Sequence, residues 1–89
     1  MNTKKTEVTK VIFRKWKDGS ILALFPYEEW SQFECASYMH LGQHSGADYN
    51  YCIRITKPAT EADYLPLYNE LTAIGYNLQI IKKYKSKNR

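Results

Sequence analysis

A turn signal between two apolar runs constrains the fold of this chain more than any other feature. Asp18-Gly19 follows Thr9–Lys17, a run rich in β-branched and aromatic residues, and precedes the apolar run Ile21–Phe25. Asp-Gly is a preferred pair for a type I′ hairpin turn, because both central residues of that turn need a positive φ. The two runs are therefore predicted to be paired antiparallel strands, the second ending at Pro26, which cannot donate to a ladder.

A two-residue loop at Asp18-Gly19 predicts a register in which Ile12 opposes Phe25 and Trp16 opposes Ile21. Both faces of this hairpin are then apolar, whereas a half-buried antiparallel strand normally has one polar face. We expect a helix to cover one face, which leaves the other as an interface with a second copy of the chain or with a protein partner. The predicted interface residues are Ile12, Arg14, Trp16, Ile21 and Phe25.

The rest of the chain is predicted to add three strands and one helix. Thr60 and Asp63 have the spacing of a capping box and stand ahead of an apolar stripe at helical spacing. The predicted strands are Glu34–Leu41, Tyr49–Thr56 and Tyr76–Tyr84, and the predicted loops are Tyr27–Phe33 and Gly42–Asp48. The expected fold class is α+β, a small antiparallel sheet of about five strands in the order ββββαβ, with one helix on one face.

With 89 residues, the chain is expected to form a single domain, because it is too short for two cores. Residues 1–8 and 85–89 are predicted to be flexible tails. The longest apolar run, Ile21–Phe25, is far shorter than the ~18–20 residues that cross a bilayer, and the N-terminal residues show no apolar secretion signal. We therefore expect a cytoplasmic protein without membrane contact.

Charge is segregated along the sequence. Residues 1–17 carry six basic and one acidic side chain, residues 82–89 carry five basic ones and none that is acidic, and the segment between them is acidic. Basic ends suit a polyanionic partner, although they also serve as solubilising tails. The alternative function is therefore a small nucleic-acid-binding accessory protein. Its predicted contacts are Lys82, Lys83, Lys85, Lys87 and Arg89.

The cysteines and histidines do not follow a known metal-binding pattern. Cys35, His40, His44, Asp48 and Cys52 include the ligand types of zinc, but no Cys-x₂₋₄-Cys knuckle is present. Both cysteines are expected to be reduced thiols, with Cys35 as a small core residue. No catalytic residue, metal or cofactor is predicted, and a zinc- or cysteine-dependent enzyme ranks third among the functions.

The segment Gly42–Asp48 is a second candidate site. Its two glycines allow a tight turn, and loops on a rigid sheet often carry recognition groups. The predicted recognition residues are His40, Gln43, His44 and Asp48. The same polar side chains would equally serve to satisfy the backbone of their own loop.

Three stretches of the sequence resemble a family of small uncharacterised proteins of gut bacteria of the Bacteroides type and of their phages and mobile elements. The stretches are Val11–Pro26, the run Ser37-Tyr38-Met39-His40-Leu41-Gly42-Gln43-His44-Ser45-Gly46-Ala47-Asp48-Tyr49, and the ending Gly75-Tyr76-Asn77-Leu78. The resemblance implies an accessory intracellular role and a mobile-element origin, and no activity, cofactor or catalytic residue is carried over from it. The leading functional prediction is a non-enzymatic interaction module that self-associates or binds a protein.

Overall fold

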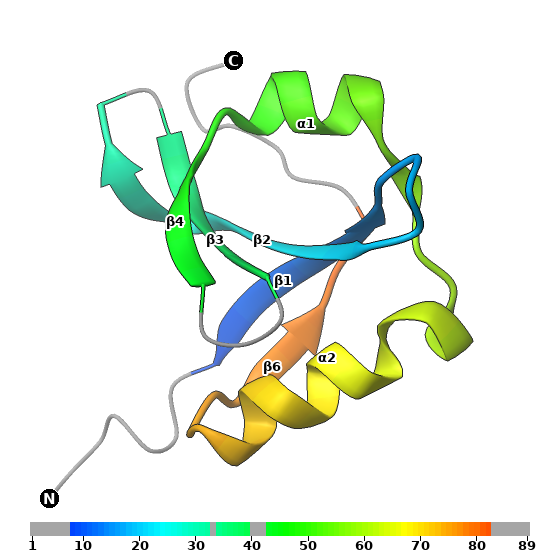
Figure 1. Cartoon of the computed structure of the whole chain (residues 1–89). Coiled ribbons are helices and arrows are strands. Elements are labelled where there is room, and N and C mark those ends of the chain that lie inside the picture. Colours follow the sequence, from blue (N-terminus) through cyan, green and yellow to red (C-terminus); the bar gives the residue numbers. More distant parts are fainter. Residues whose placement is uncertain (1–7, 33, 40–42, 83–89) are drawn as a thin grey trace, which may run out of the picture.

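A computed structural model describes residues 8–32, 34–39 and 43–82. A twisted, mostly antiparallel sheet lies in the middle, with one helix above it and one below it in Figure 1, which confirms the α+β class. The strands are β1 (Thr9–Lys15), β2 (Ile21–Ser31), β3 (Glu34–Met39), β4 (Gln43–Ala47), β5 (Lys57–Pro58) and β6 (Leu78–Ile80). The helices are α1 (Tyr49–Ile55) and α2 (Glu61–Ala73). The strand order is β4-β3-β2-β1-β5, and β6 pairs with β1 in parallel.

The β1–β2 hairpin forms where it was predicted, but its register differs by one residue. Ile12 pairs with Leu24, and Lys15 pairs with Ile21. The backbone N–H of Trp16 donates to the carbonyl of Ser20 at 2.9 Å, and Gly19 has a φ of 92°. The loop therefore has three residues and carries glycine in the left-handed position, an arrangement that is also common in hairpins. Asp-Gly signals the turn without specifying which of the two loop lengths forms.

The predicted interface residues do not share one face of the sheet. Ile12 belongs to the buried cluster on the α1 side, where Trp16 packs beside it. Phe25 belongs to the cluster on the α2 side, where Ile21 packs. Arg14 is almost buried and is hydrogen-bonded to residues of α1 and the turn after it. The predicted apolar face is therefore wrong, because the register shift moves half of its members to the other side and a second helix covers the remainder.

Helix α1 forms where a strand was predicted. The side chain of Asp48 caps its first turn by accepting the N–H of Tyr51 at 3.0 Å. Tyr49, Cys52 and Ile53 face the sheet together. Their spacing of i, i+3 and i+4 is helical, and burial of this face overrides the strand-like alternation of the segment.

Two predicted loops are also strands. β2 continues through Ser31, across most of the predicted loop Tyr27–Phe33. β4 occupies most of Gly42–Asp48 and pairs with β3, placing Tyr38 opposite His44. Pro26 was expected to end the second strand, and the two glycines of Gly42–Asp48 suggested a loop. Pro26 instead lies inside β2, and the polar residues described beyond it and in β4 are exposed.

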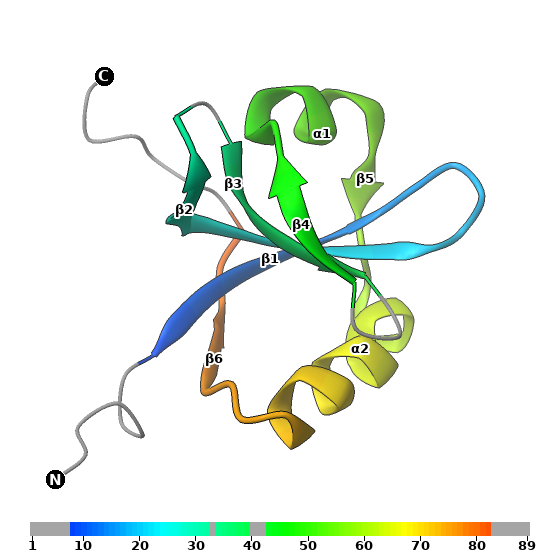
Figure 2. The ribbon, with the colours of Figure 1, turned by 60° about the vertical axis from the view of Figure 1, so that its left-hand side comes forward.

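Helices α1 and α2 lie on opposite sides of the sheet (Figure 2), and each side has a packed core. The α2-side core consists of Val11, Phe13, Ala23, Phe25, Tyr38, Leu67 and Leu71, and the α1-side core of Ile12, Leu22, Leu24, Cys35 and Cys52. The predicted capping box of Thr60 and Asp63 is confirmed, and the helical stripe packs through Leu67 and Leu71. Ile74 has the spacing of the same stripe and was expected to pack with it, but it is the C-cap residue of α2 and is 55% exposed.

The predicted tails fall almost entirely outside the described residues, which begin at Val8 and end at Lys82. Among the described helices, neither has the length and apolar character needed to cross a membrane.

Candidate functional site

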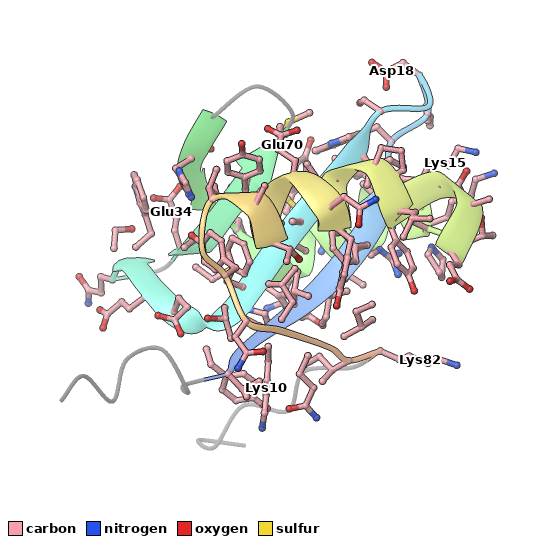
Figure 3. The ribbon with its side chains drawn as sticks, turned by 90° about the horizontal axis from the view of Figure 1, so that it is seen from below. Lys10, Lys15, Asp18, Glu34, Glu70 and Lys82 are labelled. Atoms are coloured by element: carbon pink, nitrogen blue, oxygen red, sulfur yellow. The ribbon has the colours of Figure 1, made fainter. Side chains whose placement is uncertain are left out.

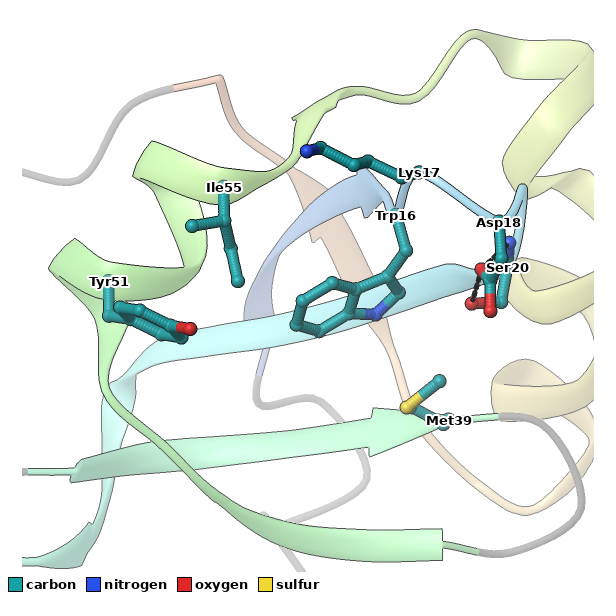
Figure 4. A pocket seen from close by; sticks show the side chains of 7 residues that line it. All are labelled: Trp16, Lys17, Asp18, Ser20, Met39, Tyr51 and Ile55. Atoms are coloured by element: carbon teal, nitrogen blue, oxygen red, sulfur yellow. Dashed lines mark hydrogen bonds between the residues drawn. The ribbon is translucent and has the colours of Figure 1, made fainter.

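An open hollow of about 540 Å³ lies where the C-terminal part of α1 meets the β1–β2 turn (Figure 4). We call it the apolar cavity. Trp16 contributes its indole from the turn, Met39 lies at the end of β3, and Tyr51 and Ile55 project from α1. Lys17, Asp18 and Ser20 complete the lining. A volume of this size falls within the range of ligand-binding pockets.

A second hollow, of about 790 Å³, adjoins the first and shares Trp16, Lys17, Asp18 and Ile55 with it. We call it the basic cavity. Its lining includes the four cations Lys15, Lys17, Arg54 and Lys57 and a single carboxylate, Asp18. These cations come from β1, the hairpin turn, α1 and β5. The fold therefore gathers positive charge from four parts of the chain at one surface.

The cations of the basic cavity differ in their pairing. Lys15 Nζ lies 3.3 Å from Asp63 Oδ1, the carboxylate that also belongs to the capping box of α2. Lys17, Arg54 and Lys57 are exposed, and none of the three forms an ion pair with another described residue. The Arg54 guanidinium lies 5.9 Å from the centre of the Tyr51 ring. These three side chains are therefore available to an anionic ligand.

Arg14 holds α1 against the sheet beside both cavities. Its Nη2 donates to the carbonyl oxygens of Ile53 at 3.0 Å and Thr56 at 2.7 Å, and its Nε donates to Thr56 Oγ1 at 2.9 Å. The residue is 9% exposed, and burial lowers the pKa of the guanidinium, which the nearby Tyr49 partly offsets. These bonds satisfy carbonyls at the end of the helix. Arg14 is thus a positioning residue for the α1 side chains that line the cavities.

Trp16 lines both cavities and has an unusual donor. Its Nε1–H is closed off from solvent and has no hydrogen-bond partner in the described part of the chain. The indole N–H can only donate, and buried donors without an acceptor are rare in folded proteins. Among the described residues, no aromatic ring stacks on the indole. Packing alone therefore does not explain the polar end of this side chain.

The predicted recognition loop is wrong as a loop, and its described residues make separate structural contacts. His44 Nε2 lies 2.9 Å from the hydroxyl oxygen of Tyr76, and the His44 ring meets the Tyr38 ring edge-on at 4.6 Å. Asp48 caps α1, as described above. Gln43 is described only through its strand pairing, and His40 lies outside the described residues. The structure does not gather these residues into one site.

Both cysteines are buried in the α1-side core and are free thiols. Burial, helped by the neighbouring Cys52, raises the pKa of Cys35 to about 11. Burial and then Asp48 raise the pKa of Cys52 as well. Such thiols stay protonated at neutral pH and are poor nucleophiles. Within the described ranges, no three His, Cys, Asp or Glu side chains are grouped as a metal ion would require.

Sequence reasoning missed the basic cavity because it counted charge along the chain. Arg54 and Lys57 lie in the acidic middle segment of the sequence, yet the fold brings them beside Lys15 and Lys17. Of the predicted C-terminal contacts, Lys82 is described and exposed, whereas Lys83, Lys85, Lys87 and Arg89 lie outside the described residues. Comparison with family models, curated proteins and solved structures found no match to the chain.

Proposed function

We propose that this protein binds the phosphate backbone of nucleic acid through the basic cavity. The observation that carries the proposal is the convergence of Lys15, Lys17, Arg54 and Lys57 on one hollow. Cations clustered on one face are the electrostatic footprint of a nucleic-acid-binding protein, because they replace the counterions of the phosphates. The proposal keeps the alternative function that the charge of the sequence suggested, and it rests on a different set of cations.

The charges of the remaining surface support this choice. Glu28, Glu29 and Glu34 are exposed on β2 and β3, towards the end of β2 that lies away from the β1–β2 turn. Figure 3 shows Glu34 on one side of the molecule, with Lys15 and Asp18 on the other. Glu28 lies seven residues along β2 from Ile21, a path of roughly 23 Å at about 3.3 Å per residue, compared with a screening length of about 8 Å at physiological salt. These carboxylates therefore do little to cancel the positive potential of the basic cavity.

The leading prediction from the sequence, a protein interface on an uncovered apolar face, has lost its support. The hairpin register does not create the apolar face that was expected to be open, and on the side where Ile12 lies, helix α1 covers Ile12, Leu22 and Leu24. The apolar surface left open beside α1 is the apolar cavity, which is bordered by the cations described above. A polyanion matches this combination better than an apolar protein surface, which would leave those charges unpaired.

The test is a salt titration of binding to a labelled single-stranded oligonucleotide, followed by fluorescence anisotropy. The double variant Lys17→Ala/Lys57→Ala should bind more weakly and show a salt slope smaller by about 1.4, since each phosphate contact on a single strand contributes about 0.7. The double variant Lys10→Ala/Lys82→Ala is the matched control. It removes the same charge from exposed lysines on another side of the molecule (Figure 3) and should leave the slope unchanged.

Two results would contradict the proposal. Equal effects of the two double variants would show that net charge, and not the basic cavity, governs binding. No salt-dependent binding at low ionic strength would remove the nucleic-acid function altogether, because phosphate contacts are strongest under that condition.

A further inference from the structure

We infer that the apolar cavity holds an unpaired base of a single-stranded nucleic acid whose phosphates lie in the adjoining basic cavity. This inference rests on the proposed function. It specifies the kind of nucleic acid that binds, which is a single strand with accessible bases and not a duplex. The two cavities adjoin each other and share four lining residues, Trp16, Lys17, Asp18 and Ile55. A single ligand with a flat ring and an adjacent anion would fill both.

The lining of the apolar cavity suits a planar ring. Figure 4 shows the Trp16 indole in the middle of the hollow, with Tyr51 and Ile55 on the α1 side and Met39 on the sheet side. Tyr51 is 51% exposed, which is a large open aromatic surface for a protein of this size. Bases of single strands stack on such aromatic side chains with little regard to sequence, because every base has a π-face.

The cations stand where the phosphates of a stacked nucleotide need them. Arg54 lies one helix position before Ile55, which borders both cavities, and its guanidinium is 5.9 Å from the centre of the Tyr51 ring. Lys17 lines both cavities as well. An aromatic platform flanked by cations is the usual arrangement of proteins that bind single strands, with the cations following the backbone.

The unpartnered indole N–H is a second, independent observation that favours a base. Nε1 of Trp16 is buried without an acceptor among the described residues. A pyrimidine base brings carbonyl oxygens that can accept from this N–H into the apolar cavity, where the indole lies. The nitrogen is closed off from solvent, so forming this hydrogen bond requires a lining side chain to move. Met39, drawn below the indole in Figure 4, is unbranched and the most adaptable of the lining residues.

A duplex fits this arrangement poorly. Its bases are stacked and paired, so that one of them would have to leave the helix to enter the cavity. An unpaired base reaches the cavity without that step. We therefore expect the protein to prefer single strands over duplexes carrying the same number of phosphates on each strand.

The experiment compares the affinities of three labelled probes at one salt concentration. The first is an oligothymidylate of about ten nucleotides, a length within the usual site size. The second is an abasic oligonucleotide of the same length, and the third is a duplex that contains the oligothymidylate strand. Oligothymidylate should bind about 5- to 150-fold more tightly than the abasic probe for one stacked base. Equal affinity for these two probes would overturn the inference and leave phosphate binding intact. Binding of none of the probes would overturn the proposed function as well.

A pair of variants locates the base. Tyr51→Ala should weaken binding of oligothymidylate and leave the abasic probe unaffected, and the exposure of Tyr51 makes the change compatible with folding. Trp30→Ala is the matched control, since Trp30 is 52% exposed at the far end of β2, and it should change neither affinity. If Tyr51→Ala weakened both probes equally, Tyr51 would be acting through the phosphate contacts, and the inference would be wrong.

Discussion

The two faces of the sheet are covered by helices of unequal length, and the shorter helix leaves a site open. Helix α2 has 13 residues and α1 has seven, which correspond to about 20 Å and about 10 Å of helix. The strand β2 beneath them is roughly three times as long as α1. Helix α1 therefore covers only part of its face. The apolar cavity lies beside this helix (Figure 4), and the basic cavity adjoins its C-terminal end through Arg54, Ile55 and Thr56.

The α2 face is closed by interlocking side chains. Phe13 stacks on Tyr64 with ring centres 4.6 Å apart, and Phe25 stacks on Tyr76 at 5.2 Å. The hydroxyl group of Tyr38 donates to the carboxylate of Glu70 across the same layer. A chain of 89 residues can thus concentrate its packing on one face of its sheet and leave part of the other face open to a ligand.

The largest expected effect is on the α2 face. Leu71→Ala should lower the free energy of unfolding by about 2–5 kcal/mol, because Leu71 is fully buried and the change leaves an enclosed cavity. Ile55→Ala, at the rim of the apolar cavity, should have a distinctly smaller effect, because solvent already reaches that site. Urea denaturation measures both. Equal destabilisation by the two substitutions would contradict the conclusion that the α2 face is closed and the α1 face is partly open.

The next effect concerns the attachment of α1. Arg14→Met should lower the free energy of unfolding by about 1–3 kcal/mol, because the carbonyls of Ile53 and Thr56 lose their donor in a partly buried setting. Amide hydrogen exchange should then quicken in α1 more than in α2. Equal acceleration in both helices would show that α1 is not held separately and would weaken the account of how the cavities are built.

A third effect, confined to pH above about 9, tests how well the α1-side core is closed away from the cavity. The raised pKa of Cys35, about 11, means that the unfolded chain loses this proton at a lower pH than the native chain does. The native state should therefore lose stability between about pH 9 and pH 11. Cys35→Ala should remove that part of the pH dependence, measured as the difference in unfolding free energy from the unchanged protein.

Alkylation provides the control for this prediction. With a raised pKa and a buried sulfur, Cys35 should react slowly with iodoacetamide at pH 8 until denaturant is added. Rapid alkylation of the native protein would show that the α1 side is open beyond the cavities.

The elements that were predictable depend on local signals. The turn at Asp18-Gly19 and the capping box of Thr60 and Asp63 are specified by residues close in sequence, and the structure contains both features. Segment Tyr49–Thr56 was wrongly predicted as a strand, because its alternation suits a strand, while the spacing of Tyr49, Cys52 and Ile53 also suits a helix. Burial against the sheet decides between them, and burial is a tertiary property.

The candidate site was not predictable as a whole. Trp16 was singled out from the sequence, but as a member of a face that the hairpin register does not create. The cations of the basic cavity are separated by up to 42 positions in sequence, between Lys15 and Lys57. Their convergence depends on Arg14 anchoring α1 and on β5 pairing with β1. Both contacts join segments that are distant in sequence, and no local sequence pattern predicts them.

The most direct test of the central claim reads the two tryptophans separately. The chain has two indole N–H groups, one from Trp16 in the cavities and one from Trp30 at the far end of β2, and each gives its own signal in a ¹H–¹⁵N correlation spectrum. On titration with oligothymidylate, we expect the Trp16 indole signal and the backbone amides of Lys17, Tyr51 and Arg54 to shift. The Trp30 indole signal should stay in place. A shift of the Trp30 signal with the Trp16 signal unmoved, or shifts confined to α2, would contradict the account.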